Sequence, residues 1–281
     1  MSLNLGIRMH DIDQLPTFEE RMAKIHEGGF KCGHLALSKM FSDISTDNAA
    51  LTPGFAMYLK DLFAKYEIQP AVLGCYINLA TPNEEQLKKT VETFRAHIRF
   101  AKWLGIGVVG TESFAPNESG AFCPECHTQE ALDLFIERLR PIVAYAEQMG
   151  VVVAIEPAHL HIVSNPKRAR YMLDTINSPN LMIIFDPVNM INIPDFENRQ
   201  LIFDEVMELL GPDICMIHFK DATFVDGRWS CPPAGFGEMD YLPILKFIKE
   251  KKPHIHVTLE NTTPENNQAA KNYILQKYEE A

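Results

Sequence analysis

The sequence lacks any long hydrophobic run. No stretch approaches the roughly 20 consecutive apolar residues that a membrane-spanning helix needs, and no charged leader followed by an apolar segment opens the chain. We therefore expect a cytoplasmic protein with no membrane partner.

Basic charge is also scarce, since 26 Lys and Arg residues face 37 Asp and Glu residues and leave a net charge of -11. A protein that grips a polyanion usually carries a basic face, so nucleic acid is not an expected partner. The chain has only six cysteines, and their scattered positions favour free thiols in a reducing compartment over a disulfide framework.

No linker, low-complexity tract or charge block interrupts the 281 residues. A hydrophobic fraction of 46% is enough for a sizeable core. The chain is therefore expected to form a single domain over residues 1–281.

Short apolar runs alternate with longer amphipathic ones from end to end, as in α/β proteins. Strands are expected at residues 3–9, 32–37, 71–77, 107–111, 151–156, 181–186, 214–219 and 254–259. Helices are expected at residues 18–27, 52–66, 83–104, 128–149, 166–176, 199–210, 241–251 and 264–279. Eight such units in about 280 residues predict a (β/α)8 TIM barrel. A doubly wound open sheet is the structural alternative.

Four consecutive expected strands, the fifth to the eighth, end in polar residues: Glu156, Asp186, His218 and Glu260. In a barrel these ends meet at one rim, where the active site is built. Three buried carboxylates would repel one another, and a divalent cation removes that cost. Oxygen-rich coordination with one imidazole suits Mn²⁺, Zn²⁺, Mg²⁺ or Co²⁺. The alternative is that each acidic residue caps a helix or pairs with a basic neighbour.

These residues and their surroundings, at 154–157, 184–189, 217–221 and 259–261, resemble the xylose-isomerase-like TIM-barrel superfamily, the sugar phosphate isomerase/epimerase family. The resemblance implies one divalent metal ion held by Glu156, Asp186, His218 and Glu260. In ketose epimerases of this family the two glutamates also exchange a carbon-bound proton across the substrate. The expected catalytic residues are therefore Glu156 and Glu260.

Two positions depart from the epimerase pattern. The family usually has a histidine three residues after the metal Asp, where this chain has Asn189, and an arginine about six residues after the metal His, where it has Phe224. Arg228 and Lys220 are candidate substitutes for that arginine. The expected substrate-binding residues are His161, Asn189, Lys220 and Arg228.

Further polar residues at strand ends could line the same bowl, although loop caps or salt bridges explain each of them as well. They are Arg8, His10, His34, Tyr76, Asn78, Glu112, His159 and Asp221. In the loop at residues 227–238, Trp229 or Phe236 could stack on a sugar face. Cys123 and Cys126 form one C-x-x-C pair without a second pair, which favours a lid or subunit contact over structural zinc.

The leading hypothesis is a metal-dependent isomerase or epimerase of a sugar or sugar phosphate, acting by proton transfer at a carbon next to a metal-held carbonyl. A lyase of the same family, similar to an inosose dehydratase, would use the same base to expel water. A DNA repair hydrolase similar to endonuclease IV and a non-catalytic sugar-binding barrel are weaker alternatives. The expected partner is a small sugar, and a homo-oligomer is possible.

Overall fold

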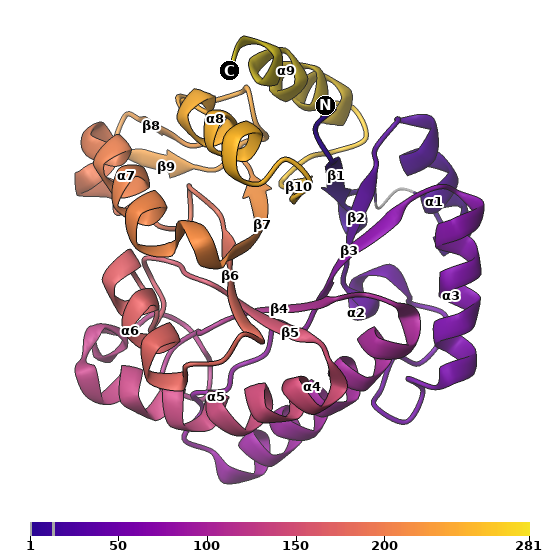
Figure 1. Cartoon of the computed structure of the whole chain (residues 1–281), viewed down its shortest axis with the longest axis vertical. Helices are drawn as coiled ribbons and strands as arrows, with labels where there is room; N and C mark the ends of the chain where they lie inside the picture. Colours follow the sequence, from indigo (N-terminus) through magenta and orange to yellow (C-terminus); the bar gives the residue numbers. More distant parts are fainter. Residues whose placement is uncertain (1, 13–14) are drawn as a thin grey trace.

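Eight parallel strands close into a barrel in the computed structural model, which describes residues 2–12 and 15–281 (Figure 1). Their bounds are β1 Leu5–Arg8, β2 Cys32–Leu35, β3 Gln69–Gly74, β4 Val108–Glu112, β5 Val152–Glu156, β6 Leu181–Phe185, β7 Ile214–Phe219 and β10 His256–Leu259. Each strand pairs with the next in chain order, and β10 closes the ring against β1. The (β/α)8 prediction is confirmed, and the open sheet is excluded because β1 and β10 are paired.

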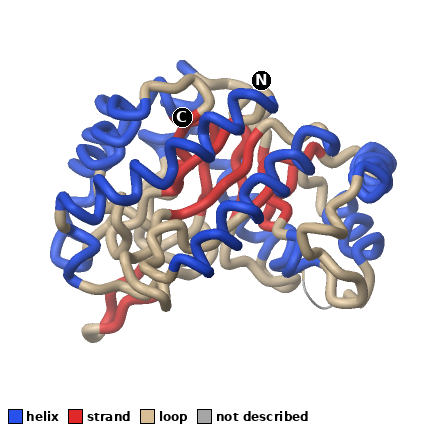
Figure 2. Tube along the Cα trace, turned by 90° about the horizontal axis from the view of Figure 1, so that it is seen from below, coloured by secondary structure: helices blue, strands red, loops and turns tan. Residues whose placement is uncertain are grey.

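The helices surround the strands as an outer ring, which Figures 1 and 2 show from two directions. The α-helices are α1 Phe18–Glu27, α2 Leu37–Met40, α3 Pro53–Lys65, α4 Glu84–Leu104, α5 Gln129–Met149, α6 Pro166–Ile176, α7 Arg199–Leu210, α8 Leu242–Lys251 and α9 Asn267–Glu280. Short 3-10 turns are η1 Met9–Asp11, η2 Pro124–His127, η3 Ile193–Asn198 and η4 Gly211–Asp213. All eight expected helices are present within a few residues of the predicted bounds, and α2 was not predicted.

Local sequence signals set the ends of the two longest helices. The Asn83 side chain accepts hydrogen bonds from the first turn of α4, and Thr128 does the same for α5. Gly105 and Gly150 end these helices with φ of 89° and 68°, a left-handed conformation that glycine adopts at little cost. The resulting 21-residue helices form one continuous side of the outer ring.

The barrel interior is filled by small and branched side chains. Cys32, Ala71, Val72, Ala154, Ile184 and Met216 form a buried cluster separate from the larger core that lies between strands and helices. Neighbouring backbones approach closely here, since a Cβ atom on Gly6 would lie 1.9 Å from the Cys32 carbonyl oxygen. The interior is therefore packed, and the functional space lies above it, at the carboxyl ends of the strands.

An antiparallel hairpin, β8 Thr223–Val225 and β9 Arg228–Ser230, follows β7 and projects from the lower edge of the molecule in Figure 2. The expectation for this segment is a loop, and the hairpin is not predicted. Asp226 and Gly227 form its turn with φ of 52° and 73°, as a two-residue type I′ turn requires. The hairpin carries Phe224 and Arg228 away from the barrel surface, and both are exposed.

Buried Asp221 anchors the chain that returns from this hairpin. Its carboxylate accepts hydrogen bonds, each 2.9 Å long, from the backbone N–H groups of Ala222, Gly235 and Met239. We expect Asp221→Ala to lower the free energy of unfolding by about 3 kcal/mol, because three backbone donors lose a charged acceptor. Urea unfolding of this variant checks the value, with exposed Asp61→Ala on α3 as a control. A change no larger than that of the control would show that the anchor contributes little.

None of the helices in the described part of the chain is both long and apolar enough to cross a lipid bilayer.

Candidate metal centre and cavity

Glu156, Asp186, His218 and Glu260 meet at the carboxyl end of the barrel and are called the ligand cluster below. Glu156 ends β5, Asp186 follows β6, His218 lies near the end of β7, and Glu260 follows β10. One ligand atom from each lies within 4.8 Å of the others, and all four residues are buried. The structure thus brings together the four residues that the sequence analysis selected as metal ligands.

His218 lies between the two glutamates. Its Nδ1 is 3.3 Å from Oε2 of Glu156 and 3.3 Å from Oε1 of Glu260, yet neither ring nitrogen has a well-aligned hydrogen bond among the described residues. Burial alone would lower the pKa of His218, but the Glu260 and Glu156 carboxylates outweigh burial and raise it to about 9. A buried imidazole between carboxylates is a donor set that a divalent cation fits.

The two glutamates have different surroundings. Glu156 accepts hydrogen bonds from neutral donors, namely the Tyr76 hydroxyl at 2.9 Å and the Asn189 amide at 2.7 Å. Glu260 faces cations, since Arg8 Nη1 and Lys220 Nζ are each 3.4 Å from its Oε2. Burial raises the pKa of Glu260, but His218, Lys220 and Arg8 together bring it well below its usual value.

Lys220 is buried beside the ligand cluster, with Nζ 2.7 Å from Oδ2 of Asp186. Burial lowers the pKa of this ammonium, but Asp186, Glu260 and Glu156 raise it well above its usual value. The other oxygen of Asp186 accepts the backbone N–H groups of Val188 and Asn189 at 2.8 and 3.1 Å. Lys220 is therefore a fixed cation in direct contact with one of the candidate ligands.

The four predicted substrate-binding residues lie at different distances from the cavity. Asn189 and Lys220 line a cavity of about 940 Å³ above the ligand cluster. His161 is not among the lining residues but lies next to two that are, with Nδ1 4.0 Å from Oε2 of Glu112 and its ring stacked on Phe114. Arg228 does not reach the cavity because the hairpin β8–β9 carries it outward.

Several of the weaker sequence candidates also line the cavity: Arg8, His10, His34, Tyr76 and Glu112. Others have structural contacts instead. The Asn78 amide donates to the carbonyls of Ala115 and Asn117 at 3.1 and 2.7 Å. Trp229 packs edge-on against Phe196 and, like Phe236, does not line the cavity.

The sulfur atoms of Cys126, on η2, and of Cys123, just before it, lie 4.0 Å apart. Among the described residues no third donor completes a metal-binding group with them. The cavity wall also includes residues that no sequence pattern predicts: Ser38, Lys39, residues 46–49, Thr93 and His97. The polar composition of the loop before residue 52 is the sequence feature that could have indicated the loop part of this wall.

Glu112, at the end of β4, is paired in register with Glu156 on β5. Burial and the Glu156 carboxylate raise the pKa of Glu112 to about 8 in the metal-free protein. Because this value lies above its ordinary 4.5, the folded protein retains a proton that the unfolded chain releases. The contribution of Glu112 to stability therefore falls as pH rises from about 4.5 to about 8.

We expect Glu112→Gln to flatten the pH dependence of the metal-free protein's Tm over this range, because glutamine stays neutral. Thermal unfolding after chelation at pH 5 to 8.5 measures the effect, with exposed Glu92→Gln on α4 as control. Parallel Tm curves for wild type and Glu112→Gln would contradict the raised pKa.

The comparisons with known proteins agree with the barrel fold. A model of the family described as xylose isomerase-like TIM barrel matches residues 22–276. No curated protein sequence matches the chain. Similar solved structures include a D-tagatose 3-epimerase-like protein at 22% identity, with a TM-score of 0.76, covering 99% of this chain and 97% of that one.

Two further structures are 3-keto-D-glucoside 4-epimerase from E. coli and the IolI protein with a bound zinc atom. The first is 14% identical with a TM-score of 0.73, covering 98% of this chain and 99% of that one. The second is 16% identical with a TM-score of 0.73, covering 99% and 96%. At these identities the structures establish a shared fold alone. Because the family model matches most of its length, this chain belongs to the xylose isomerase-like TIM barrel family.

Proposed function

We propose that this protein is a divalent-metal-dependent isomerase or epimerase of a sugar or sugar phosphate, which moves a proton at a carbon next to the substrate carbonyl. The observation that carries the proposal is the ligand cluster, in which four buried donors from consecutive barrel positions converge within 4.8 Å. A similar fold that holds zinc supports the choice of a divalent cation.

Glu156, Asp186, His218 and Glu260 would hold the cation. When bound, the cation polarises the substrate carbonyl and its neighbouring hydroxyl, so that the hydrogen on the carbon between them becomes acidic. It also offsets the repulsion among the three carboxylates, a role that Lys220 and Arg8 fill in part within the structure described here.

Glu156 and Glu260 are the proposed acid–base pair. Each has a carboxylate oxygen 3.3 Å from Nδ1 of His218. One carboxylate would take the carbon-bound proton and the other would return a proton at the opposite face. The cationic surroundings of Glu260 favour its ionised form, which is the form a base needs.

Asn189 and Lys220 are the proposed direct substrate contacts, and His161 would act through Glu112 and Phe114, which line the cavity beside it. Asn189 already donates to Glu156, so it can orient that carboxylate as well as bind a hydroxyl. Arg228 is left out of this set because its side chain is exposed on the hairpin.

A lyase is the second candidate, and Lys220 is the observation that favours it. Its ammonium is 2.7 Å from Asp186 and 3.4 Å from Glu260, where its fixed positive charge would stabilise a hydroxide leaving the substrate after a carboxylate has taken the carbon-bound proton. The product of such a reaction would be lighter than the substrate by one water.

Incubation in deuterated water with Mn²⁺ or Zn²⁺ distinguishes these two functions. The substrates to be tested are ketoses, ketose phosphates and inososes. The proposal expects one deuterium at a carbon next to the carbonyl, without loss of mass, detected by NMR and mass spectrometry. Loss of one water would establish the lyase instead. Absence of both deuterium exchange and water loss in every class, with metal content confirmed, would overturn both.

A further inference from the structure

The cavity extends well beyond the ligand cluster. Its volume of about 940 Å³ is near the upper end of the range of about 300 to 1,000 Å³ for sites that enclose drug-sized ligands. A single six-carbon sugar is smaller than such ligands. The remaining volume lies toward the first half of the chain, between α2, the segment at residues 46–49 and α4.

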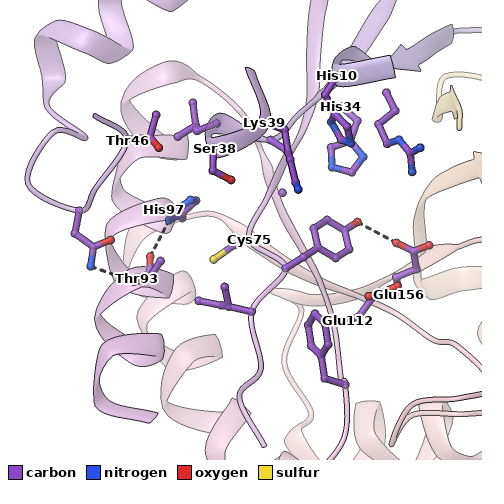
Figure 3. A pocket seen from close by; sticks show the side chains of 18 of the residues that line it. His10, His34, Ser38, Lys39, Thr46, Cys75, Thr93, His97, Glu112 and Glu156 are labelled. Atoms are coloured by element: carbon purple, nitrogen blue, oxygen red, sulfur yellow. Dashed lines mark hydrogen bonds between the residues drawn. The ribbon is translucent and has the colours of Figure 1, made fainter. Parts of the chain in front are cut away.

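Eight polar residues line this far end, called the distal lobe: Ser38, Lys39, Thr46, Asp47, Asn48, Lys89, Thr93 and His97, of which Lys89 is already paired with Glu85. In Figure 3 Ser38, Thr46, Thr93 and His97 gather at one end of the view, and Glu112 and Glu156 lie at the other. The Asn48 amide donates to the Thr93 hydroxyl at 3.1 Å and so ties the loop to α4. The lobe is thus a defined part of the cavity wall.

His97 presents a hydrogen-bond acceptor to the distal lobe. Its Nδ1 lies 2.9 Å from the carbonyl oxygen of Thr93, which can only accept, so Nδ1 carries the proton. Burial lowers the pKa of His97 and keeps the ring neutral. Nε2 is then an unprotonated acceptor, and among the described residues nothing donates to it.

The lobe also presents donors without partners. Within the described ranges the Lys39 ammonium has no ion pair, and the Ser38 and Thr46 hydroxyls make no side-chain hydrogen bond. Thr93 accepts from Asn48, which leaves its own hydroxyl proton free to donate. Asp47, on the same wall, adds a negative charge.

This mixture of donors and acceptors indicates which kind of ligand the distal lobe fits. A phosphate group at neutral pH mainly accepts hydrogen bonds, so Asp47 and Nε2 of His97 would face it unfavourably. An apolar group would leave every one of these polar atoms unpaired. Sugar hydroxyls donate and accept at once, and they match both kinds of partner.

We propose that the distal lobe binds a second polyhydroxylated unit, so that the substrate is a keto sugar joined to another sugar or polyol. This inference rests on the proposed function for the reacting end of the substrate. The ligand cluster would hold the keto unit, while Lys39, Thr93 and His97 would bind hydroxyls of the attached unit.

The proposal is tested with the Mn²⁺-loaded full chain on six sugars. They are fructose, fructose 6-phosphate and the glucosyl-fructoses turanose, maltulose, leucrose and isomaltulose. These disaccharides share the keto unit and differ in the oxygen that carries glucose. Deuterium exchange gives kcat/KM, and calorimetry with reduced analogues lacking the carbonyl gives affinity without turnover. For at least one disaccharide, we expect kcat/KM and the affinity of the reduced analogue each to exceed the values for fructose and its reduced analogue about tenfold or more.

His97→Leu and Thr93→Val are expected to lower that disaccharide-to-fructose ratio roughly threefold to tenfold each. His97→Gln, which retains a side-chain acceptor, should restore part of it. Exposed Lys88→Met, on the same helix but outside the cavity, is the matched control and should leave the ratio unchanged.

Equal values for fructose and all four disaccharides would overturn the proposal, as would a preference for fructose 6-phosphate over all of them. A preference that survives both His97→Leu and Thr93→Val would also overturn it. If no sugar exchanges deuterium but a disaccharide analogue still binds more tightly in a His97-dependent way, the proposed function fails and the distal lobe stands.

Discussion

Glu260→Gln is expected to reduce deuterium exchange into the substrate by about 10²- to 10⁴-fold, the usual contribution of a positioned general base. Glutamine has nearly the same shape and can still contact Arg8 and Lys220, but its amide cannot take a proton from carbon at neutral pH. The rate of exchange under saturating Mn²⁺ measures the effect, with circular dichroism to confirm that the fold is retained.

Metal content must be measured in the same samples, because Glu260 is also a proposed ligand. If excess Mn²⁺ restores occupancy but not exchange, the loss belongs to proton transfer rather than to binding of the cation. Glu250→Gln, an exposed substitution on α8, is the matched control. Exchange at the wild-type rate in Glu260→Gln would show that this residue is not the base.

His218→Ala is expected to weaken binding of the divalent cation by about 100-fold or more. It removes the only imidazole of the ligand cluster and leaves Glu156 and Glu260 without the group that lies between them. Loss of an outer contact to a metal ligand typically costs 10- to 100-fold in affinity, so loss of the ligand itself should cost at least as much. Competition with a chromogenic chelator measures the affinity.

His254→Ala provides the comparison, since this exposed histidine precedes β10 and lies outside the cavity. Its metal affinity should equal that of the wild type. Unchanged affinity in His218→Ala would remove His218 from the proposed ligand set.

The ligand cluster could be predicted from the sequence because its signal is local. An apolar run that ends in an acidic residue or histidine identifies a strand exit, and a parallel barrel gathers its strand exits at one rim. Glu156, Asp186, His218 and Glu260 each follow this rule. The interaction of Asn189 with Glu156 could not be read in this way, because it depends on how the turn after β6 is folded over β5.

Two further differences between the sequence-based predictions and the structure, at Arg228 and His97, have separate physical causes. Arg228 was selected by counting residues from His218, but the Asp226–Gly227 turn, a strong hairpin signal, reverses the chain and carries it outward. His97 lies in an expected helix, yet the path of the loop at residues 46–49 over α4 is what makes it part of a cavity. Loop paths depend on tertiary contacts that periodicity does not encode.

The two ends of the cavity come from different halves of the chain. The ligand cluster is built by β5, β6, β7 and β10, whereas the distal lobe is built by α2, the loop that follows it and α4. A mutant library confined to residues 38–49 and 89–97 would therefore vary one wall without altering any residue of the ligand cluster. Divergence among descendants of such a barrel can follow the same division, because drift within residues 38–49 and 89–97 leaves the ligand cluster and its contacts with Arg8 and Tyr76 intact.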